Sequence, residues 1–463
     1  MAYNTPGVYV EEISALPPSV AGVATAIPAF IGYTQQATLY TAGDLTLKPT
    51  RITSMVEYEK YFGGADPEVK IKVAVTTATN GSVNAVATLA EADRSVHLMW
   101  YAVRLYFDNG GGPCYICSVA DYKALVLTEL ESGLTAIGKE DEPTLLVFPE
   151  AQYLGIADCK SLYDQALQQC AALQNRFLIM DTHGDTLSLN DPGTDIGAAV
   201  KKFRDNGTPA NNLKYGAAYA PNLETTVRFA YDDTQTDVTV GASPAAKLST
   251  LETSDNQSYN LAIGAINKLA CKLPPSGAMA GIYAAVDNAR GVWKAPANLS
   301  VADAIQPTIT IDGTAQDTMN VDSTSGKSVN AIRAFTGLGT LVWGARTLAG
   351  NDNEWRYVNV RRFCIFAEES IRRATRQFVF EPNDANTWVK VKGMIENFLN
   401  SLWRQGALMG AKAADAYSVQ VGLGSTMTAL DVLEGRMVVV VGLCPVRPAE
   451  FIVLRFVQTM PVS

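Results

Sequence analysis

The sequence predicts an α/β chain, α+β overall, on three observations. Short apolar runs of strand character alternate with segments of helical periodicity between residues 120 and 290. The C-terminal third mixes amphipathic helical patterns with further short strands. Both ends carry isolated β-type segments bounded by prolines. With 463 residues, the chain has room for two or three domains of roughly 150 residues each.

Composition excludes several broad classes of protein. Hydrophobic residues make up 48% and charged residues 18%, which supplies large cores and argues against a disordered chain. The net charge of -9 argues against a general nucleic-acid binder, which would carry a basic face. No basic segment followed by an apolar run opens the sequence, and no run approaches ~18 apolar residues, so we expect no signal peptide and no transmembrane helix.

The first β-type segment spans residues 5–13 and is closed by Pro17 and Pro18. Its side chains alternate between two faces, with Val8 and Val10 on one and Tyr9, Glu11 and Ile13 on the other. A short strand isolated by prolines cannot complete its own hydrogen-bond ladder. We therefore expect it to pair with a distant segment of this chain or of another one.

The middle of the chain predicts a layer of parallel strands. Buried strands are expected at 25–34, 114–119, 144–148 and 177–180, and helices at 98–107 and 157–173. Two stretches rich in small or polar residues, 64–95 and 228–258, interrupt this pattern as insertions, the second as a polar excursion or hairpin.

The C-terminal third begins after the break at Pro274–Gly277. A strand is expected at 361–365, followed by a helix over 368–380. Thr387 is the expected N-cap of the next helix, whose apolar stripe contains Trp388, Val391, Ile395, Leu399 and Leu402. The two strongest β signals of the chain, 437–443 and 450–458, are separated by Pro445 and Pro448.

Three features of the sequence could be drawn as catalytic or ligand-binding sites, and each lacks a part that the chemistry needs. His183 lies between Asp181 and Asp185 and could belong to a hydrolase triad or a metal site, but no nucleophile motif or second histidine accompanies it. Cys114 and Cys117 have redox spacing, yet their flanks predict a strand that would turn the two thiols to opposite faces. Gly326-Lys327-Ser328 lacks the earlier glycine of a phosphate loop. We expect no catalytic residue, cofactor or metal.

The seven cysteines are odd in number and irregular in spacing, which indicates free thiols made in a reducing compartment rather than a disulfide framework. A cluster of arginines admits two interpretations. It is either a solvated helix face or a docking surface for an acidic partner, and its members are Arg361, Arg362, Arg372, Arg373 and Arg376.

Several long motifs resemble contractile tail sheath proteins. They are TPGVYVEEI at 5–13, FIGYT at 30–34, SGAMAGIYAAVDNARGVWKAPAN at 276–298, NAIRAFTGLGTLVWGARTLAG at 330–350, WRYVNVRRFCIFAEESI at 355–371, FVFEPNDANTWVKVKGMIENFL at 378–399, GALMGAKAADAYSVQVGLGST at 406–426 and VRPAEFIVLRF at 446–456. The resemblance is nearly continuous from 276 to 458 and patchier from 99 to 275. Within the family, the sequence most resembles the sheaths of contractile phages and of extracellular contractile injection systems.

The resemblance implies a structural protein without catalytic chemistry. Such subunits form stacked hexameric rings around an inner tube and contract to drive the tube through a target envelope. Implied partners are other copies of the chain, the inner tube, and baseplate and terminal cap proteins, with no nucleic acid and no direct membrane insertion. Synthesis and assembly are expected in the bacterial cytoplasm, as part of a phage tail or tail-like particle whose release from the cell is left open.

The resemblance also implies a domain plan. A linker arm at 1–18 precedes an α/β domain at 19–290 that contains a subtilisin-like layer and the insertions near 64–95 and 228–258. A C-terminal sheath core follows at 291–446 and a strand or arm at 447–463. The layer leaves open an alternative, a hydrolase that uses His183.

The terminal arms of such proteins add strands to sheets of neighbouring subunits, which suits the orphan segments found here. The expected exchange residues are Val8, Tyr9, Val10, Glu11, Ile13, Phe451, Val453, Leu454 and Phe456. Contact with the tube is expected from the helices between 368 and 404. The candidate side chains are Arg372, Arg373, Arg376, Lys390 and Lys392, with solvated charges as the alternative.

Overall fold

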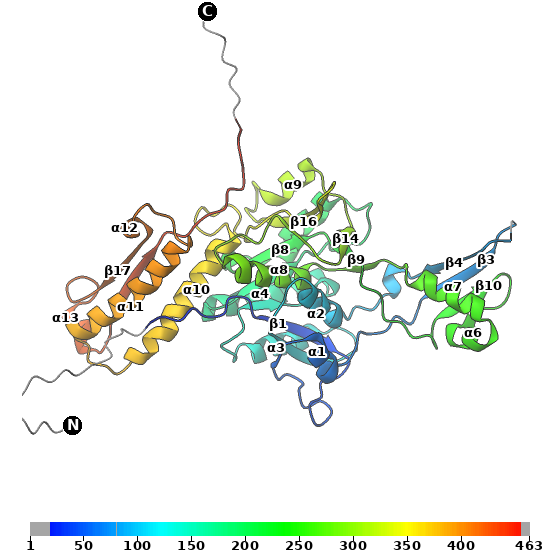
Figure 1. Ribbon diagram of the computed structural model, residues 1–463, viewed down its shortest axis with the longest axis horizontal. Coiled ribbons are helices and arrows are strands. Elements are labelled where there is room, and N and C mark those ends of the chain that lie inside the picture. The colour runs from blue at the N-terminus through cyan, green and yellow to red at the C-terminus, as the bar shows by residue number, and fades with distance from the viewer. Residues whose placement is uncertain (1–18, 80, 455–463) are drawn as a thin grey trace, which may run out of the picture. The chain divides into compact units, whose positions relative to one another are not determined.

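The computed structural model describes residues 19–79 and 81–454, which divide by their contacts into two compact units (Figure 1). Among the described residues, unit 1 comprises 19–23 and 367–446, and unit 2 comprises 24–366 and 447–454. The chain passes between the units after Val23, Phe366 and Val446. The domain boundary implied by the resemblance lies between 290 and 291 and stays a prediction. Strands on both sides of that point belong to one sheet, which is why the contacts keep them together.

Unit 2 is built on a nine-stranded sheet with the order β13-β16-β15-β8-β7-β6-β1-β5-β2. The six strands from β15 to β5 run parallel, and β13, β16 and β2 are antiparallel to their neighbours. The strands are β1 (Pro28–Thr34), β2 (Thr50–Ile52), β5 (Cys114–Asp121), β6 (Leu145–Val147), β7 (Phe177–Asp181), β8 (Gly216–Ala220), β13 (Leu299–Ser300), β15 (Val329–Phe335) and β16 (Gly339–Val342). The predicted α/β class is confirmed, and its likeness to subtilisin stays a prediction.

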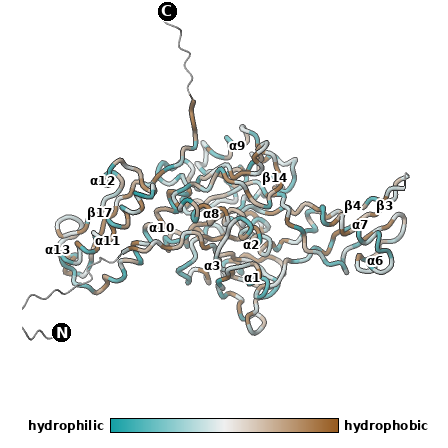
Figure 2. Tube along the Cα trace, viewed as in Figure 1, coloured by the Kyte–Doolittle hydropathy of each residue, from teal (hydrophilic) through white to brown (hydrophobic). Residues whose placement is uncertain are grey.

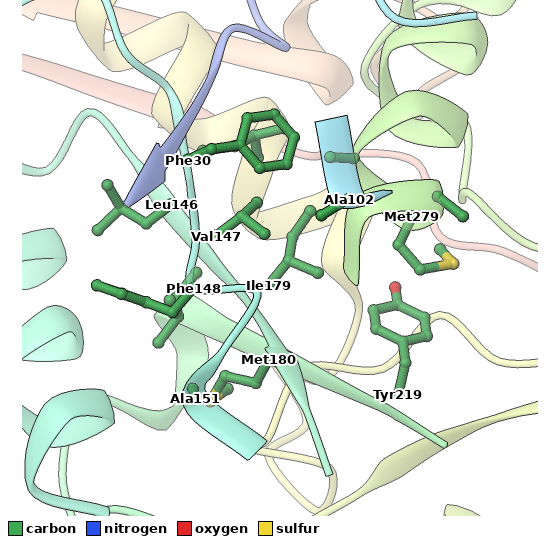
Figure 3. Close-up of a cluster of buried hydrophobic side chains, with 14 of the residues drawn as sticks. Phe30, Ala102, Leu146, Val147, Phe148, Ala151, Ile179, Met180, Tyr219 and Met279 are labelled. Carbon is green, nitrogen blue, oxygen red and sulfur yellow. The ribbon is translucent and has the colours of Figure 1, made fainter. Parts of the chain in front are cut away.

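Helices cover both faces of this sheet. Adjacent residues of a strand point to opposite faces, and Phe30 packs on Tyr106 of α2 (Met99–Asp108) whereas Ile31 lies at Gly133 of α3 (Leu127–Ile137). The helix α8 (Ser276–Arg290) packs beside α2, and α4 (Ile156–Leu173) packs beside α3. Figure 3 shows side chains of the sheet meeting those of α2 and α8 in one buried cluster.

Glycines in α8 explain the close approach of α2. A Cβ atom on Gly277 would lie 2.4 Å from the carbonyl oxygen of Ala102, and one on Gly281 would lie 2.5 Å from that of Tyr106. Both glycines belong to the motif at 276–298, so this part of the resemblance has a packing reason.

The two predicted insertions come together as a small sheet in unit 2. Its strands, in the order β11-β10-β3-β4, are β3 (Lys72–Thr77), β4 (Val83–Thr88), β10 (Asp237–Val240) and β11 (Ala246–Lys247). The helices α6 (Leu248–Ser254) and α7 (Asn256–Ile266) belong to the same hydrophobic core, which is separate from that of the nine-stranded sheet. Of the two forms expected for 228–258, a polar excursion or a hairpin, the hairpin is present, because β10 and β11 pair antiparallel. It is one half of a folded subdomain in which β10 also pairs in parallel with β3.

The remaining elements of unit 2 are short. A three-stranded sheet contains β9 (Leu223–Thr225), β12 (Cys271–Leu273) and β14 (Ala304–Pro307), and the other helices are α1 (Met55–Phe62), α5 (Ile196–Lys202) and α9 (Gly313–Asn320).

Unit 1 contains α11 (Ala385–Arg404), α12 (Ala413–Ala416), α13 (Ala429–Leu433) and a two-stranded sheet of β17 (Tyr417–Val421) and β18 (Val439–Leu443). The helix α10 (Val358–Thr375) begins in unit 2 and ends in unit 1. The expected strand at 361–365 is wrong, because these residues lie inside α10. Apolar residues and both arginines are buried there together, so the amphipathic pattern that marks a surface helix is missing.

The start of α11 also corrects the sequence analysis. Asp384, not Thr387, is the N-cap, and its carboxylate accepts a hydrogen bond of 2.9 Å from the amide of Thr387. Both residue types cap helices well, so local sequence could not separate them. The predicted apolar stripe is correct for Val391, Ile395, Leu399 and Leu402, which are buried.

Two buried carboxyl groups cap α2 and α8 from other parts of unit 2. Glu150, which follows β6, accepts hydrogen bonds from the amides of Leu98 and Met99, each 3.2 Å long. Asp181, at the end of β7, accepts from the amide and hydroxyl of Ser276 at 2.8 and 2.6 Å. Neither helix has a side-chain cap from its own N-cap residue. Neighbouring parallel strands thus satisfy the free amides of two helices that pack together.

Burial raises the pKa of Glu150 to about 8, although His97 opposes this shift, and it raises the pKa of Asp181 to about 7. The folded chain therefore binds both protons more tightly than the unfolded chain does. Their contribution to stability is fully present below the ordinary carboxyl pKa and is lost as the pH rises to about 8.

We predict that Glu150→Gln flattens the dependence of stability on pH between 5 and 8. The wild type should lose several kcal/mol over this window, since each pKa unit corresponds to about 1.4 kcal/mol. Asp181 should preserve part of the slope. Urea unfolding at several pH values measures the effect, with the exposed Glu252→Gln as control. An unchanged slope in Glu150→Gln would contradict the assignment.

Candidate assembly site

The C-terminal segment exposes four consecutive apolar side chains. Phe451, Ile452, Val453 and Leu454 are 70%, 80%, 76% and 72% exposed, and none of them belongs to a strand. The last described part of the chain is coloured as hydrophobic in Figure 2. The strand predicted over 450–458 therefore does not form within its described part, 450–454. A run with strong β propensity has no partner strand among the described residues of its own chain, which is the condition under which strand addition to another chain is favourable.

The sheet β17–β18 offers edges for such an addition. Its residues pair from Tyr417 with Leu443 to Val421 with Val439. One face packs on α11, where Asn400 donates to the hydroxyl of Tyr417. No backbone hydrogen bond from residues 19–79 or 81–454 reaches the outer edge of either strand. Both strands are thus edge strands with unused amides and carbonyls.

The expected exchange residues at the N-terminus, Val8, Tyr9, Val10, Glu11 and Ile13, lie outside the described residues, as does Phe456. The nearest described part of that end is held within unit 1, because the amide of Val23 donates to the hydroxyl of Ser370 at 3.1 Å.

The arginine cluster divides into two groups. Arg361 and Arg362 are each 3% exposed, so they form neither a solvated face nor a docking surface. Arg362 donates to the carboxylate of Asp287 in α8 through Nη1 at 3.0 Å and Nη2 at 2.6 Å. Arg361 lies over the rings of Tyr215 and Trp355. Both arginines are structural members of unit 2.

The other arginines of the cluster and Lys390 of α11 are exposed, and Lys392 of α11 is partly exposed. The side chains of Arg372 and Arg373 are 50% and 38% exposed and share the buried carboxylate of Glu369. Arg376 and Lys390 are exposed, and Lys392 lies 3.8 Å from Glu396. The exposed pair of Lys392 and Glu396 is worth little in water, so a charged partner could displace it at low cost.

The candidate catalytic residues have structural roles. Nε2 of His183 donates to the carbonyl of Leu154 at 2.8 Å, and Nδ1 accepts from the amide of Asp185 at 2.8 Å. Both ring nitrogens are thereby occupied by the backbone. Cys114 and Cys117 are buried on β5, and burial raises the pKa of Cys117 to about 12 and that of Cys114 as well. Lys327 donates to Thr208 and to the carbonyl of Arg204.

Within residues 19–79 and 81–454, no three His, Cys, Asp or Glu side chains are grouped to hold a metal ion. The described helices include none that is long and apolar enough to cross a membrane.

Sequence reasoning missed one residue of this site, Glu450. It follows Pro448 and immediately precedes the exposed run, and its carboxylate is bound by Arg346, Asn320 and Tyr357. A lone carboxylate between a proline and an apolar run is a signal that could have drawn attention, but partners about 100 residues away are invisible to local pattern.

Comparison with known proteins decides the family. Residues 350–459 match the phage tail sheath C-terminal domain. The contracted sheath of the extracellular contractile injection system PVC is 31% identical over 99% of both chains, with a TM-score of 0.65. The chain belongs to the contractile tail sheath protein family. The contracted helical sheath of the anti-feeding prophage (AFP) is also 31% identical, over 99% of this sheath chain and 100% of the relative, with a TM-score of 0.65.

A chain from the contracted AFP baseplate is 26% identical to this sheath protein over 98% of its length and 99% of the relative, with a TM-score of 0.68. A comparison with curated protein sequences gave no match. The chain is a structural sheath subunit of contractile injection systems and not an enzyme, so the hydrolase alternative built on His183 is not supported.

Proposed function

We propose that this sheath protein polymerises as stacked hexameric rings around an inner tube and contracts to drive the tube through a target envelope. The observation that carries the proposal is that one chain has both an exposed apolar run, 451–454, and a two-stranded sheet with open edges. Relatives at 31% identity form sheath assemblies in a contracted state, and others occur in baseplates, which supports self-assembly and baseplate contact here.

The connection between copies is strand exchange. The run 451–457 and the segment 8–13 of one copy add to sheets of adjacent copies, and the edges of β17 and β18 supply the free amides and carbonyls. Main-chain hydrogen bonds then hold copies together while their packed surfaces change. Energy for contraction is stored in that packing, so no nucleotide site is required.

Electron microscopy of the purified full-length protein tests this function. We expect hollow cylinders, and we expect His183→Ala to form the same cylinders because its imidazole bonds only to the backbone of its own chain. The variant also serves as a control for stability, measured by thermal unfolding. A wild-type protein that stays monomeric under all assembly conditions would contradict the proposal and favour a monomeric binding module.

The inner tube is held in the extended state through weak, screened ion pairs. The candidate side chains are Arg372, Arg373, Arg376, Lys390 and Lys392, all on α10, α11 or the short turn between them. Exposed charges suit this role, since they give specificity and register yet release on contraction. The alternative is that they are solvated charges with no partner protein.

We predict that reversing Lys390 and Lys392 to Glu lowers retention of the tube. Two lost attractions of about 1 kcal/mol each should reduce tube occupancy of extended particles on the order of tenfold or more, and the loss should shrink at high salt. Lys412→Glu, an exposed lysine outside these helices, is the matched control. Equal tube content in both variants would favour solvated charges.

A further inference from the structure

The base of the C-terminal arm is fastened by one carboxylate. Glu450 accepts from Nε of Arg346 at 2.9 and 3.2 Å and from Nη2 at 2.7 Å. Nδ2 of Asn320 and the hydroxyl of Tyr357 donate to it at 2.8 and 3.1 Å. Four donor groups from three residues thus converge on one side chain. Bidentate arginine–carboxylate pairs are among the strongest and most directional hydrogen-bonded contacts in proteins.

Arg346 is itself fixed to the nine-stranded sheet. It is 3% exposed, and its amide donates to Oδ1 of Asn330 in β15 at 2.7 Å. Nδ2 of Asn330 donates back to the carbonyl of Arg346 at 2.7 Å and to the carbonyl of Ala218 in β8 at 3.1 Å. A continuous series of hydrogen bonds therefore joins Glu450 to two adjacent parallel strands in the interior of unit 2.

The hydrogen bonds between the C-terminal segment and the rest of unit 2 end at Glu450, immediately before the exposed run 451–454. Arg447 donates to the carbonyl of Asn353 at 2.7 Å, Glu450 makes the contacts above, and the next four side chains are at least 70% exposed. On the other side of the crossing, the amide of Val446 donates to the carbonyl of Ala407 in unit 1. The four residues from Arg447 to Glu450 thus have their own attachment to unit 2.

We propose that Glu450 and Arg346 form a clamp that sets where the C-terminal arm leaves unit 2 and carries tension from the arm into the nine-stranded sheet. This inference rests on the proposed exchange of the arm with a neighbouring copy. Without the clamp, residues 447–450 would peel away and lengthen the free arm by roughly 13 Å, at ~3.3 Å per residue. When one copy moves, the lengthened arm would first have to be drawn straight before the movement pulls on the next copy.

The charge state of the clamp suits neutral conditions. Burial raises the pKa of Glu450, but the hydrogen bonds from Arg346 and Asn320 outweigh it and leave the pKa below its ordinary value. The carboxylate is therefore charged while it holds the arm.

The test compares Glu450→Gln with Glu354→Gln in the full-length protein. Both changes remove one negative charge, and Glu354 is exposed and belongs to the same unit, outside the clamp. The first measurement is the mobility of a spin label on Ala449→Cys in the unassembled subunit, with Cys444→Ser in the background. Cys444 is the exposed cysteine and the other six are buried. The second measurement is the mean length of cylinders after controlled shear, seen by electron microscopy.

We expect Glu450→Gln to increase the fast-moving fraction of the label and to shorten sheared cylinders at least threefold, while Glu354→Gln matches the wild type. An unchanged label spectrum overturns the clamp. If the label of Glu450→Gln is mobile but its cylinders resist shear as well as those of the wild type, the clamp does not carry tension from the arm. Wild-type protein that forms no cylinders at all overturns the proposed function instead, and the label spectrum then still shows whether the carboxylate holds the arm.

Discussion

Removing residues 451–463 should leave a folded, soluble subunit that forms no cylinders. The described side chains in this stretch are exposed, so their loss takes nothing from either hydrophobic core. In an assembled sheath each of these large apolar side chains would contribute about 1.5–3 kcal/mol on burial, in addition to the hydrogen bonds of the added strand. Thermal unfolding measures the fold, and electron microscopy measures assembly.

Point variants can show that strand addition, and not mere length, is responsible. Val453→Pro keeps an apolar side chain but removes an amide donor, so it should block assembly as the truncation does. The double variant Ile452→Ser with Leu454→Ser removes apolar side chains from one face of the added strand. The double variant Phe451→Ser with Val453→Ser does so on the other face, so comparing assembly of the two shows which face is buried. Deleting residues 1–13 should likewise give soluble subunits that do not polymerise. Normal cylinders from either truncated chain would show that the corresponding arm does not connect copies.

Replacing Asp287 by Ala should cause the largest loss of stability in unit 2. The side chains of Asp287 and Arg362 are each 3% exposed, and the guanidinium also donates to the carbonyl of Thr25 and lies over the ring of Tyr283. Removing the carboxylate leaves the buried positive charge of Arg362 without its ion-pair partner. Such a loss typically lowers the free energy of unfolding by about 3–5 kcal/mol. Urea unfolding in the background lacking 451–463 measures this without interference from polymerisation.

Two comparisons sharpen the result for Asp287. Asp205→Ala breaks the exposed pair with Lys201 and should cost less than about 1 kcal/mol. The double variant Asp287→Leu with Arg362→Met should recover part of the loss, because no unpaired charge remains in the core. A cost below about 1 kcal/mol for Asp287→Ala would mean that the guanidinium reaches water and that the pair is not structural.

The parallel layer could be predicted because its signals are local and strong. The strands β5, β6 and β7 and the helices α2 and α4 lie where apolar runs and glycine or proline stops placed them. The first half of α10 could not be predicted as a helix, because Arg361 and Arg362 are buried with their apolar neighbours and leave no polar face. The cap of α11 failed for a different reason, since Asp384 and Thr387 are both good caps and only the turn after Pro382 selects between them.

The other features that the sequence did not predict depend on contacts between residues far apart in the chain. The parallel pairing of β3 with β10 places Val73 opposite Val238. No pattern within either segment indicates which strand it pairs with. Glu450 and Arg346 are likewise far apart in the sequence, and no local pattern indicates that they bind each other. The exposed C-terminal run, in contrast, was visible in the sequence as an apolar strand without a local partner, and that prediction about strand exchange stays open to experiment.

A reconstruction of the assembled cylinder, at a resolution that traces the main chain, tests strand exchange most directly. We predict that residues 451–457 of each copy form a strand hydrogen-bonded to a sheet of a different copy, with Glu450 still bound to Arg346 of its own chain. A map in which both ends of every chain fold back onto their own subunit would contradict this account.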